Sequence, residues 1–230
     1  MNVLAFDTCF GALSVTVQWQ AEGELRLHEA YELRSTGHAE RLFPMIAQVL
    51  KESGTTLAAI DRVAVTLGPG TFTGVRVGVA AARGLALALN RPVVGMTSLA
   101  AMAHEADALL GAERGARPLA IVVDARRGMV YFQLFTGNAL DSDGPRLATP
   151  DEAARALGDK PALVVGSGAA MVAELAGSKV EARLPDLQAH ARALAILAPR
   201  LQPLSPVTPL YLREPDVKPQ ADKALARGIT

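Results

Sequence analysis

Cysteine and histidine are scarce in this sequence. Cys9 is the only cysteine among 230 residues, so the chain can form neither an internal disulfide nor a cysteine-based zinc cluster. A small packed residue is the favoured interpretation of Cys9, and a lone thiol suits a reducing compartment such as the cytoplasm. The histidines do not pair at the spacing of metal ligands, so no zinc site is predicted; they are His28, His38, His104 and His190.

An excess of charge of either sign is also absent. Lys and Arg together number 23, as do Asp and Glu, so the formal net charge is zero. A neutral chain has no overall field to hold a polyanion, and any contact with nucleic acid must come from a local patch or from a partner. Composition alone therefore does not predict nucleic-acid binding.

The sequence has no long apolar run near its start and none of the short motifs of serine hydrolases or P-loop enzymes. The apolar run at residues 3–6 stops at Asp7, which is too short for a signal sequence or a membrane span. No serine lies in a GxSxG setting, and no lysine follows the glycine turn at Gly68 and Gly70 as it would in a P-loop. We therefore expect a cytoplasmic protein without a membrane span, and neither a serine hydrolase nor a P-loop enzyme.

What the sequence does contain is a clear alternation of strand and helix patterns. Period-two runs predict an antiparallel meander of three strands, and a helix with one apolar face follows. A fourth strand then runs into the glycine turn, a second helix, a short fifth strand and a third helix. The predicted strands are residues 3–6, 13–19, 25–33, 63–66 and 92–95, and the predicted helices are residues 38–53, residues 73–89 and a helix that begins near residue 98.

The second half of the chain starts the same pattern again. Asp7 ends the first strand four positions before Gly11, and Asp124 ends a strand at residues 119–124 four positions before Gly128. This spacing predicts an internal repeat in which the two hairpins superimpose residue for residue. The repeat continues through a second strand at residues 129–135, a helix at 150–157, a strand at 162–165 and a glycine turn at 166–168.

Two packed copies of this topology form the architecture of actin, sugar kinases and acetate kinase. We therefore predict a duplicated, actin-like α/β fold with lobes at residues 1–105 and 106–200. Residues 201–230 are rich in proline and charge, which disfavours helix and central strand, so an extended tail is expected there.

The predicted fold places the strand-end aspartates and the glycine turns at a cleft between the lobes. Backbone N–H groups of such turns can hold phosphates, and carboxylates can hold a cation, which makes Asp7, Asp124, Gly68 and Gly70 candidates for a nucleotide cleft. The alternative is that the aspartates only accept backbone hydrogen bonds in tight turns and the glycines only permit those turns. Arg126 and Arg127 are interpreted as solvated turn residues.

The second predicted helix is apolar on nearly all sides. Arg76 and Arg83 are its only charged residues, and several glycines and alanines accompany its valines and leucines. Such a helix is either enclosed within the protein or packs one face on the sheet and another on a second chain, where small residues allow close approach. We favour an interface between subunits.

With these residues identified, the sequence closely resembles the TsaB (YeaZ) family, the dimerisation subunit of the bacterial machinery that makes N6-threonylcarbamoyladenosine at position 37 of tRNA. The resemblance spans essentially the whole chain. It rests on VLAFDT at residues 3–8, HAERLFPMI at 38–46, GPGTFTGVRVGVAAARGLALAL at 68–89, VDARRGMVYFQ at 123–133 and YLREPDVKP at 211–219.

The resemblance implies a duplicated actin-like (ribonuclease H-like) fold and a non-catalytic partner of the paralogue TsaD, with the ATPase TsaE joining the complex. In the catalytic family an H-x-x-x-H pair binds iron or zinc, and the matching positions here are Ser98 and Met102. Neither side chain has an imidazole, and a helix turns His104 about 200° away from Met102, so no metal or other cofactor is expected. Contact with tRNA is expected only through the complex.

In the family, the helices matching residues 38–53 and 73–89 pack on the equivalent helices of TsaD, and the same surface can support a homodimer. The interface residues expected from these helices are Leu42, Met45, Ile46, Val49, Val75, Arg76, Val77, Ala81, Gly84 and Leu85. The rival hypothesis is a stand-alone enzyme, either a nucleotide-dependent enzyme of actin-like fold using Asp7 and Asp124 or a glycoprotease-like metallopeptidase.

Overall fold

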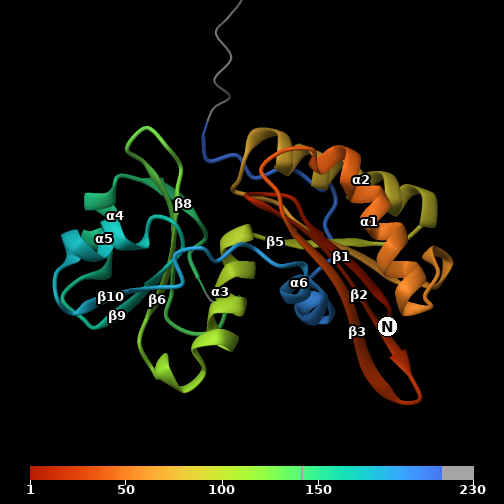
Figure 1. The fold of residues 1–230 in the computed structure, drawn as a ribbon, viewed down its shortest axis with the longest axis horizontal. Coiled ribbons are helices and arrows are strands. Elements are labelled where there is room, and N and C mark those ends of the chain that lie inside the picture. Colours follow the sequence, from red (N-terminus) through yellow and green to blue (C-terminus); the bar gives the residue numbers. More distant parts are fainter. Residues whose placement is uncertain (141, 214–230) are drawn as a thin grey trace, which may run out of the picture.

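Two five-stranded mixed sheets lie side by side in the computed structural model, which describes residues 1–140 and 142–213 (Figure 1). The first sheet has the order β3-β2-β1-β4-β5, and the second has the order β8-β7-β6-β9-β10. The elements from the first half are β1 (Val3–Asp7), β2 (Ala12–Ala21), β3 (Glu24–Leu33), α1 (His38–Ser53), β4 (Arg62–Thr66), α2 (Phe72–Leu89), β5 (Val93–Met96) and α3 (Ser98–Leu110). Those from the second half are β6 (Leu119–Asp124), β7 (Val130–Phe135), β8 (Arg146–Ala148), α4 (Pro150–Leu157), β9 (Ala162–Val165), α5 (Ala169–Ala176), β10 (Val180–Arg183) and α6 (Ala191–Leu197).

The two halves repeat one topology, which confirms the duplicated α/β fold. Each half runs through three antiparallel strands, a helix, a parallel strand, a helix, a second parallel strand and a final helix. One detail of the prediction is wrong: the hairpins do not superimpose residue for residue. Asp7 pairs with Ser14, whereas Asp124 pairs with Val130, so the first turn is one residue longer than the second.

The predicted elements of the first half are all present, with ends that differ by at most a few residues. The helix at residues 38–53 and the strand at 119–124 have the predicted bounds, and so do the helix at 150–157 and the strand at 162–165. The sequence pattern did not predict β8, α5, β10 or α6, which are all short.

The first sheet carries α1 and α2 on one face (Figure 1). Burial of the apolar stripes of both helices against the strands gives the core of this lobe, as the amphipathic pattern requires.

By length and composition α2 is also a candidate membrane span among the described residues. Here one of its sides packs on β4, with Val75, Val79 and Ala82 buried, so it is an element of the α/β lobe.

The two lobes exchange their last helices. α3 follows the first sheet but packs against β6 and β7 of the second sheet, and α6 follows the second sheet but packs against β1 and β2 of the first. The two helices contact each other between the lobes, and their apolar side chains form one core cluster there (Figure 1). A boundary at residue 105 therefore falls within α3, and a second lobe drawn as residues 106–200 includes a helix that packs on the first sheet.

The segment at residues 201–213, which we call the strap, forms no helix or strand and returns across the first lobe. Its backbone is held at two points, because the N–H of Leu204 donates to the carbonyl of Val93 (2.8 Å) and the N–H of Leu210 donates to the carbonyl of Leu67 (2.7 Å). The guanidinium of Arg213 then donates to the carbonyl of Ala125 in the second lobe (2.7 Å). The strap thus connects both lobes at the mouth of the cleft. The rest of the predicted tail, residues 214–230, lies outside the described residues.

Candidate functional site

Asp7 ends β1 and is enclosed by the first lobe, with 1% of its surface exposed. Its Oδ1 accepts a hydrogen bond from the Thr66 hydroxyl at 2.5 Å, and the N–H of Cys9 lies 3.4 Å from both carboxylate oxygens. Burial raises the pKa of Asp7 from 3.8 to about 6, and these hydrogen bonds oppose the rise. A carboxylate that is covered in this way is a hydrogen-bond acceptor of the fold rather than an open cation ligand.

The glycine turn before α2 packs directly on the turn between β1 and β2. A Cβ on Gly70 would lie 2.5 Å from the carbonyl oxygen of Cys9, and a Cβ on Gly74 would lie 2.1 Å from the carbonyl oxygen of Thr8. The N–H of Thr71 donates to the Cys9 carbonyl at 2.7 Å. Contact with the chain itself therefore explains why these positions are glycine, without a bound phosphate.

Gly68 has a different reason to be glycine. Its φ of +107° is in the region that other residues rarely adopt, and a Cβ there would meet the Leu210 carbonyl oxygen of the strap at 2.7 Å. Gly68 therefore allows the strap to approach the glycine turn.

Asp124 ends β6 at the equivalent place in the repeat, but it is exposed. Its Oδ1 accepts a hydrogen bond from the N–H of Arg126 at 2.7 Å, and its own N–H donates to the Ser167 hydroxyl at 3.0 Å. Arg126 and Arg127 have positive φ angles of 63° and 54°, as residues of a tight turn. Asp124 therefore shapes the turn after β6, and its side chain stays at the surface.

A cavity of about 470 Å³ lies between the lobes. The structure brings Asp124 and Gly70 together on its wall, whereas Asp7 and Gly68 are not among the described residues that line it. The remaining lining comes from the β1–β2 turn, the start of α2, the turn after β6, β7 and the strap. These residues are Phe10, Pro69, Thr71, Phe72, Ala125, Arg126, Tyr131, Leu210, Tyr211, Leu212 and Arg213.

The aromatic residues of this cavity were not predicted from the sequence. The chain has only 6 Phe, 3 Tyr and 1 Trp, and two of the phenylalanines and two of the tyrosines line this one cavity. Phe10 lies three positions after the predicted Asp7, and Tyr211 is the first residue of the YLREPDVKP motif. Their scarcity was the available signal, but only the fold brings them to one place.

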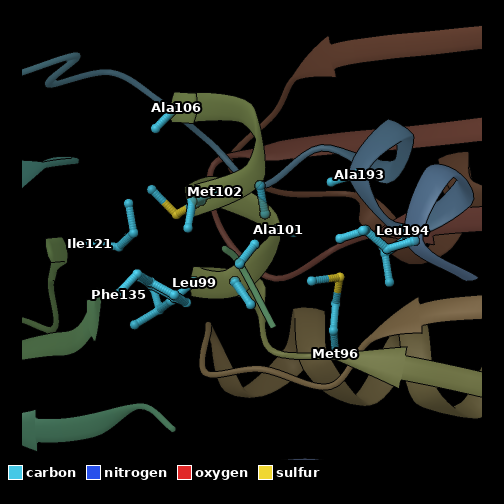
Figure 2. Close-up of a cluster of buried hydrophobic side chains, with 14 of the residues drawn as sticks. Met96, Leu99, Ala101, Met102, Ala106, Ile121, Phe135, Ala193 and Leu194 are labelled. Carbon is cyan, nitrogen blue, oxygen red and sulfur yellow. The ribbon is translucent and has the colours of Figure 1, made fainter. Parts of the chain in front are cut away.

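Ser98 and Met102, the expected counterparts of the metal ligands in the catalytic family, are buried on α3. The Ser98 hydroxyl donates to the Pro69 carbonyl at 2.5 Å, and its N–H donates to the Gly68 carbonyl at 2.9 Å. Met102 belongs to the apolar cluster between the lobes, together with Ile121 and Phe135 of the second sheet (Figure 2). The two positions thus serve packing, and no cluster of three or more His, Cys, Asp or Glu side chains suited to a metal occurs in the described ranges.

The expected interface residues fall into two groups. Seven of them are buried in the core of the first lobe, and this corrects their assignment to a partner surface: Leu42, Met45, Ile46, Val49, Val75, Ala81 and Leu85. The reason is that the apolar stripe of each helix packs on its own sheet. Arg76 and Gly84 are exposed and Val77 is half-buried.

The opposite sides of α1 and α2 form an exposed face that is unusually apolar for a surface. Leu87 is 86% exposed, Phe43 is 52% exposed and Phe72 is 39% exposed. Small exposed residues occur on the same two helices, namely Ala47, Ala80, Gly84 and Ala88. We call this set the α1/α2 face. Large apolar side chains beside small residues are typical of a surface that a second helix pair covers.

A polar cluster that the sequence did not predict joins the two exchanged helices. The Glu105 carboxylate on α3 is 4% exposed and accepts hydrogen bonds from the Arg192 guanidinium on α6 at 2.5 and 3.3 Å. Glu29 of β3 lies 3.7 Å from both Arg192 and His190, and Tyr31 stacks on the His190 ring. Burial lowers the pKa of His190, and the nearby carboxylates oppose this effect.

Comparison with known proteins gives consistent matches. The family model described as TsaD, tRNA N6-adenosine threonylcarbamoyltransferase, matches residues 31–190. The tRNA threonylcarbamoyladenosine biosynthesis protein TsaB of Escherichia coli is 39% identical over 132 residues, which cover 57% of this chain and only 54% of that protein. TsaB of Haemophilus influenzae is 34% identical over 179 residues, which cover 73% of this chain and 72% of that protein.

A solved structure is similar over nearly the whole chain. YeaZ from Pseudomonas aeruginosa has 32% sequence identity and a TM-score of 0.76, and the match covers 92% of this chain and 99% of that one. The likeness in three dimensions therefore includes both lobes.

Proposed function

Because the chain belongs to the TsaB (YeaZ) family, we propose that it is a non-catalytic subunit of the complex that forms N6-threonylcarbamoyladenosine at position 37 of tRNA, where it binds and enables the catalytic paralogue TsaD. The observation that carries this proposal is the similarity to proteins named for threonylcarbamoyladenosine biosynthesis, combined with a complete duplicated fold.

The side chains at the candidate site, which are buried or already hydrogen-bonded, support a non-catalytic role. Ser98 and Met102 fill the positions of the metal ligands with a hydroxyl that is already hydrogen-bonded and an apolar thioether. Asp7, the carboxylate that a nucleotide-dependent enzyme would present to a cation, is buried and accepts a hydrogen bond from Thr66. These residues have roles in packing, which favours a partner subunit over a stand-alone nucleotide-dependent enzyme or metallopeptidase.

The α1/α2 face is the proposed contact with TsaD. It replaces the buried residues expected from the sequence and contains Gly84 from that list, and the exposed Arg76 and the half-buried Val77 lie on the same helix. An exposed leucine such as Leu87 loses contact with water when a second helix packs on it, and full burial of such a side chain stabilises a complex by about 1.5–3 kcal/mol. Small residues beside it let the two helix pairs approach closely.

The same proposal includes the wider setting. TsaE joins the complex, a homodimer through the α1/α2 face forms when TsaD is absent, and tRNA is engaged through the complex. The site of action is the cytoplasm, which a lone buried Cys9 thiol suits.

Co-purification with TsaD, followed by an assay for the modified nucleoside, tests the proposal. TsaD and TsaE with tRNA should form the product only when this chain is added. Leu87→Arg should abolish co-purification and activity, because a charge would be placed in the apolar contact. Leu175→Arg is the matched control, since Leu175 is 51% exposed on α5, the helix that occupies the place of α2 in the second repeat.

The opposite outcomes are equally specific. Hydrolysis of ATP or of a peptide by the purified chain alone, lost in Asp7→Asn, would establish the rival enzyme hypothesis. Equal loss of TsaD binding in Leu87→Arg and Leu175→Arg would show that the contact is not on the α1/α2 face.

A further inference from the structure

β3 is the outermost strand of the first sheet, and no strand pairs with its outer edge in the part of the chain that the structure describes. It runs for 10 residues in unbroken register with β2. Its sequence, ELRLHEAYEL, contains neither the proline nor the lysine with which proteins commonly protect such an edge. A long, regular edge of this kind can pair with a further strand.

The backbone groups of alternate β3 residues point away from β2. The N–H of Arg34 donates to the Gly11 carbonyl at 2.9 Å, so these two residues form a hydrogen-bonded pair at the end of the ladder. Hydrogen-bonded and non-hydrogen-bonded pairs alternate in an antiparallel ladder. The even-numbered residues of β3 therefore bond to β2, and the odd-numbered residues direct their N–H and carbonyl groups outward. The outward residues are Leu25, Leu27, Glu29, Tyr31 and Leu33.

The side chains of this outward row are mostly apolar and exposed. Leu33 is 75% exposed and Leu25 is 56% exposed, and Leu27 and Tyr31 are exposed as well. The row lies on the side of the sheet that α6 covers, since Tyr31 stacks on the His190 ring at the start of that helix. It is therefore separate from the α1/α2 face, which belongs to the other side of the sheet.

The charges of β3 match those of a second copy of the same strand in one antiparallel register. When the pairing is centred on Glu29, Glu24 lies opposite Arg34, and Arg26 lies opposite Glu32. Opposite charges directly across two strands stabilise the pair, and like charges destabilise it. A shift of the register by two residues would oppose Glu24 to Glu32 in one direction and Arg26 to Arg34 in the other. The charge pattern thus selects one register.

The apolar side chains match in that same register. Leu25 lies opposite Leu33, and Leu27 lies opposite Tyr31, all on the α6 side of the sheet. Pairs of aromatic and aliphatic side chains across two strands are favourable contacts. A shift by one residue would place outward backbone groups opposite groups that already bond to β2, so it cannot form a ladder.

We propose that β3 pairs antiparallel with β3 of a second copy of this chain, centred on Glu29, so that the first sheets of the two copies join into one continuous sheet. The twofold axis makes the contact self-complementary. The two Glu29 carboxylates are the only like charges opposed among residues 24–34, and in each copy the Arg192 guanidinium lies 3.7 Å from Glu29. The pairing needs neither TsaD nor tRNA, so it stands apart from the proposed function.

Sedimentation equilibrium of the full chain carrying Leu87→Arg tests the proposal, because this substitution removes association through the α1/α2 face. The measured mass should change from that of one copy to that of two between about 5 µM and about 500 µM, as expected for a small interface that binds weakly. Amide hydrogen exchange at Leu27 and Tyr31 should slow over the same range, because their N–H groups become hydrogen-bonded. The N–H of His28 already faces β2, and its exchange rate should stay constant.

Leu27→Pro in this chain should leave a monomer. Proline removes an outward N–H but no hydrogen bond to β2, and an edge strand tolerates it at such a position. Leu27→Val is the matched control, because it keeps the N–H and an apolar side chain, so dimerisation should persist. Melting temperatures show whether both variants are folded.

Arg26→Glu and Glu32→Lys test the register, each in the Leu87→Arg chain. Either variant alone opposes like charges and should dimerise about 5-fold to 100-fold more weakly. In an equal mixture, each new charge faces a charge of opposite sign on the other copy, so the mixture should dimerise as tightly as the chain with the original β3. This comparison decides the matter if Leu27→Pro does not fold.

Three results would overturn the proposal. A chain that remains monomeric at about 500 µM does so, and it leaves the edge to an extended segment of another protein. A folded Leu27→Pro variant that dimerises as tightly as Leu27→Val does so too. The third result is a mixture of Arg26→Glu and Glu32→Lys that associates no more tightly than either variant alone.

Discussion

Replacement of Gly74 by alanine tests how tightly α2 is packed on the first lobe. The new Cβ would lie 2.1 Å from the carbonyl oxygen of Thr8, which is closer than real Cβ contacts come. Neither side can yield freely, because the Thr8 hydroxyl donates to the Gly74 carbonyl at 2.7 Å and the Thr71 N–H donates to the Cys9 carbonyl at 2.7 Å. Relief of the clash therefore requires α2 to move away from the β1–β2 turn.

The magnitude follows from these contacts. Overpacking of a tight site costs about 1–3 kcal/mol, and weakening of two hydrogen bonds adds about 1 kcal/mol each. The helix preference of alanine over glycine offsets at most about 1 kcal/mol. We expect Gly74→Ala to lower the free energy of unfolding by about 3 kcal/mol, which corresponds to a fall of about 6–12 °C in the melting temperature for a chain of this size.

Gly84→Ala is the matched control in the same helix. No atom lies within 4 Å of the added Cβ, so only the helix preference of alanine acts, and stability should rise by up to about 1 kcal/mol. Urea denaturation and thermal melting of the two variants beside the unaltered chain give the comparison. If Gly74→Ala were as stable as the unaltered chain to within about 0.5 kcal/mol, the packing argument for the glycine motif would be refuted.

Two further predictions concern buried charges. The pKa of Asp7 rises from 3.8 to about 6 on folding, so the folded state binds this proton more tightly than the unfolded state does. The free energy of unfolding should therefore fall by roughly 2–3 kcal/mol as the pH rises from about 4 to 6. Urea denaturation across this pH range should show a smaller fall for Asp7→Asn than for the unaltered chain. Arg192→Met leaves the Glu105 carboxylate buried without its guanidinium partner and should lower the free energy of unfolding by about 1–3 kcal/mol. In thermal melts, the double variant with Glu105→Gln should recover part of that loss. If the effects of the two substitutions on stability simply added, the coupling between Glu105 and Arg192 would be contradicted.

The sequence predicted the repeated fold well because its signals are local. Period-two runs and amphipathic stripes locate strands and helices, and the recurrence of a strand ending in Asp7 and Asp124 indicated the duplication. Short elements escaped prediction for the same reason: α6 has seven residues, nearly all apolar, and shows no polar face from which a period could be read.

The sequence did not predict which candidate residues of the site are buried, because burial depends on the element that packs on each residue. An apolar stripe on α1 indicates that something packs there, but Leu42 and Met45 meet their own sheet and not a partner. Asp7 and Asp124 are equivalent in the repeat, yet the first is buried within its lobe and the second is exposed. Tertiary packing decides both cases, and a single sequence carries no local signal of it.

The exchange of α3 and α6 also affects how the chain is made. α6 covers β1, and roughly 180 residues separate them, which a ribosome takes on the order of 10–40 s to synthesise. During that interval the face of the first sheet that α6 later covers is exposed to water. The row on β2 beneath α6 consists of Ser14, Thr16 and Gln18, and Ser14 later accepts the N–H of Ala191. These polar side chains reduce the apolar surface that β2 exposes before α6 is made, whereas Val3 and Ala5 on β1 remain apolar positions that α6 later covers.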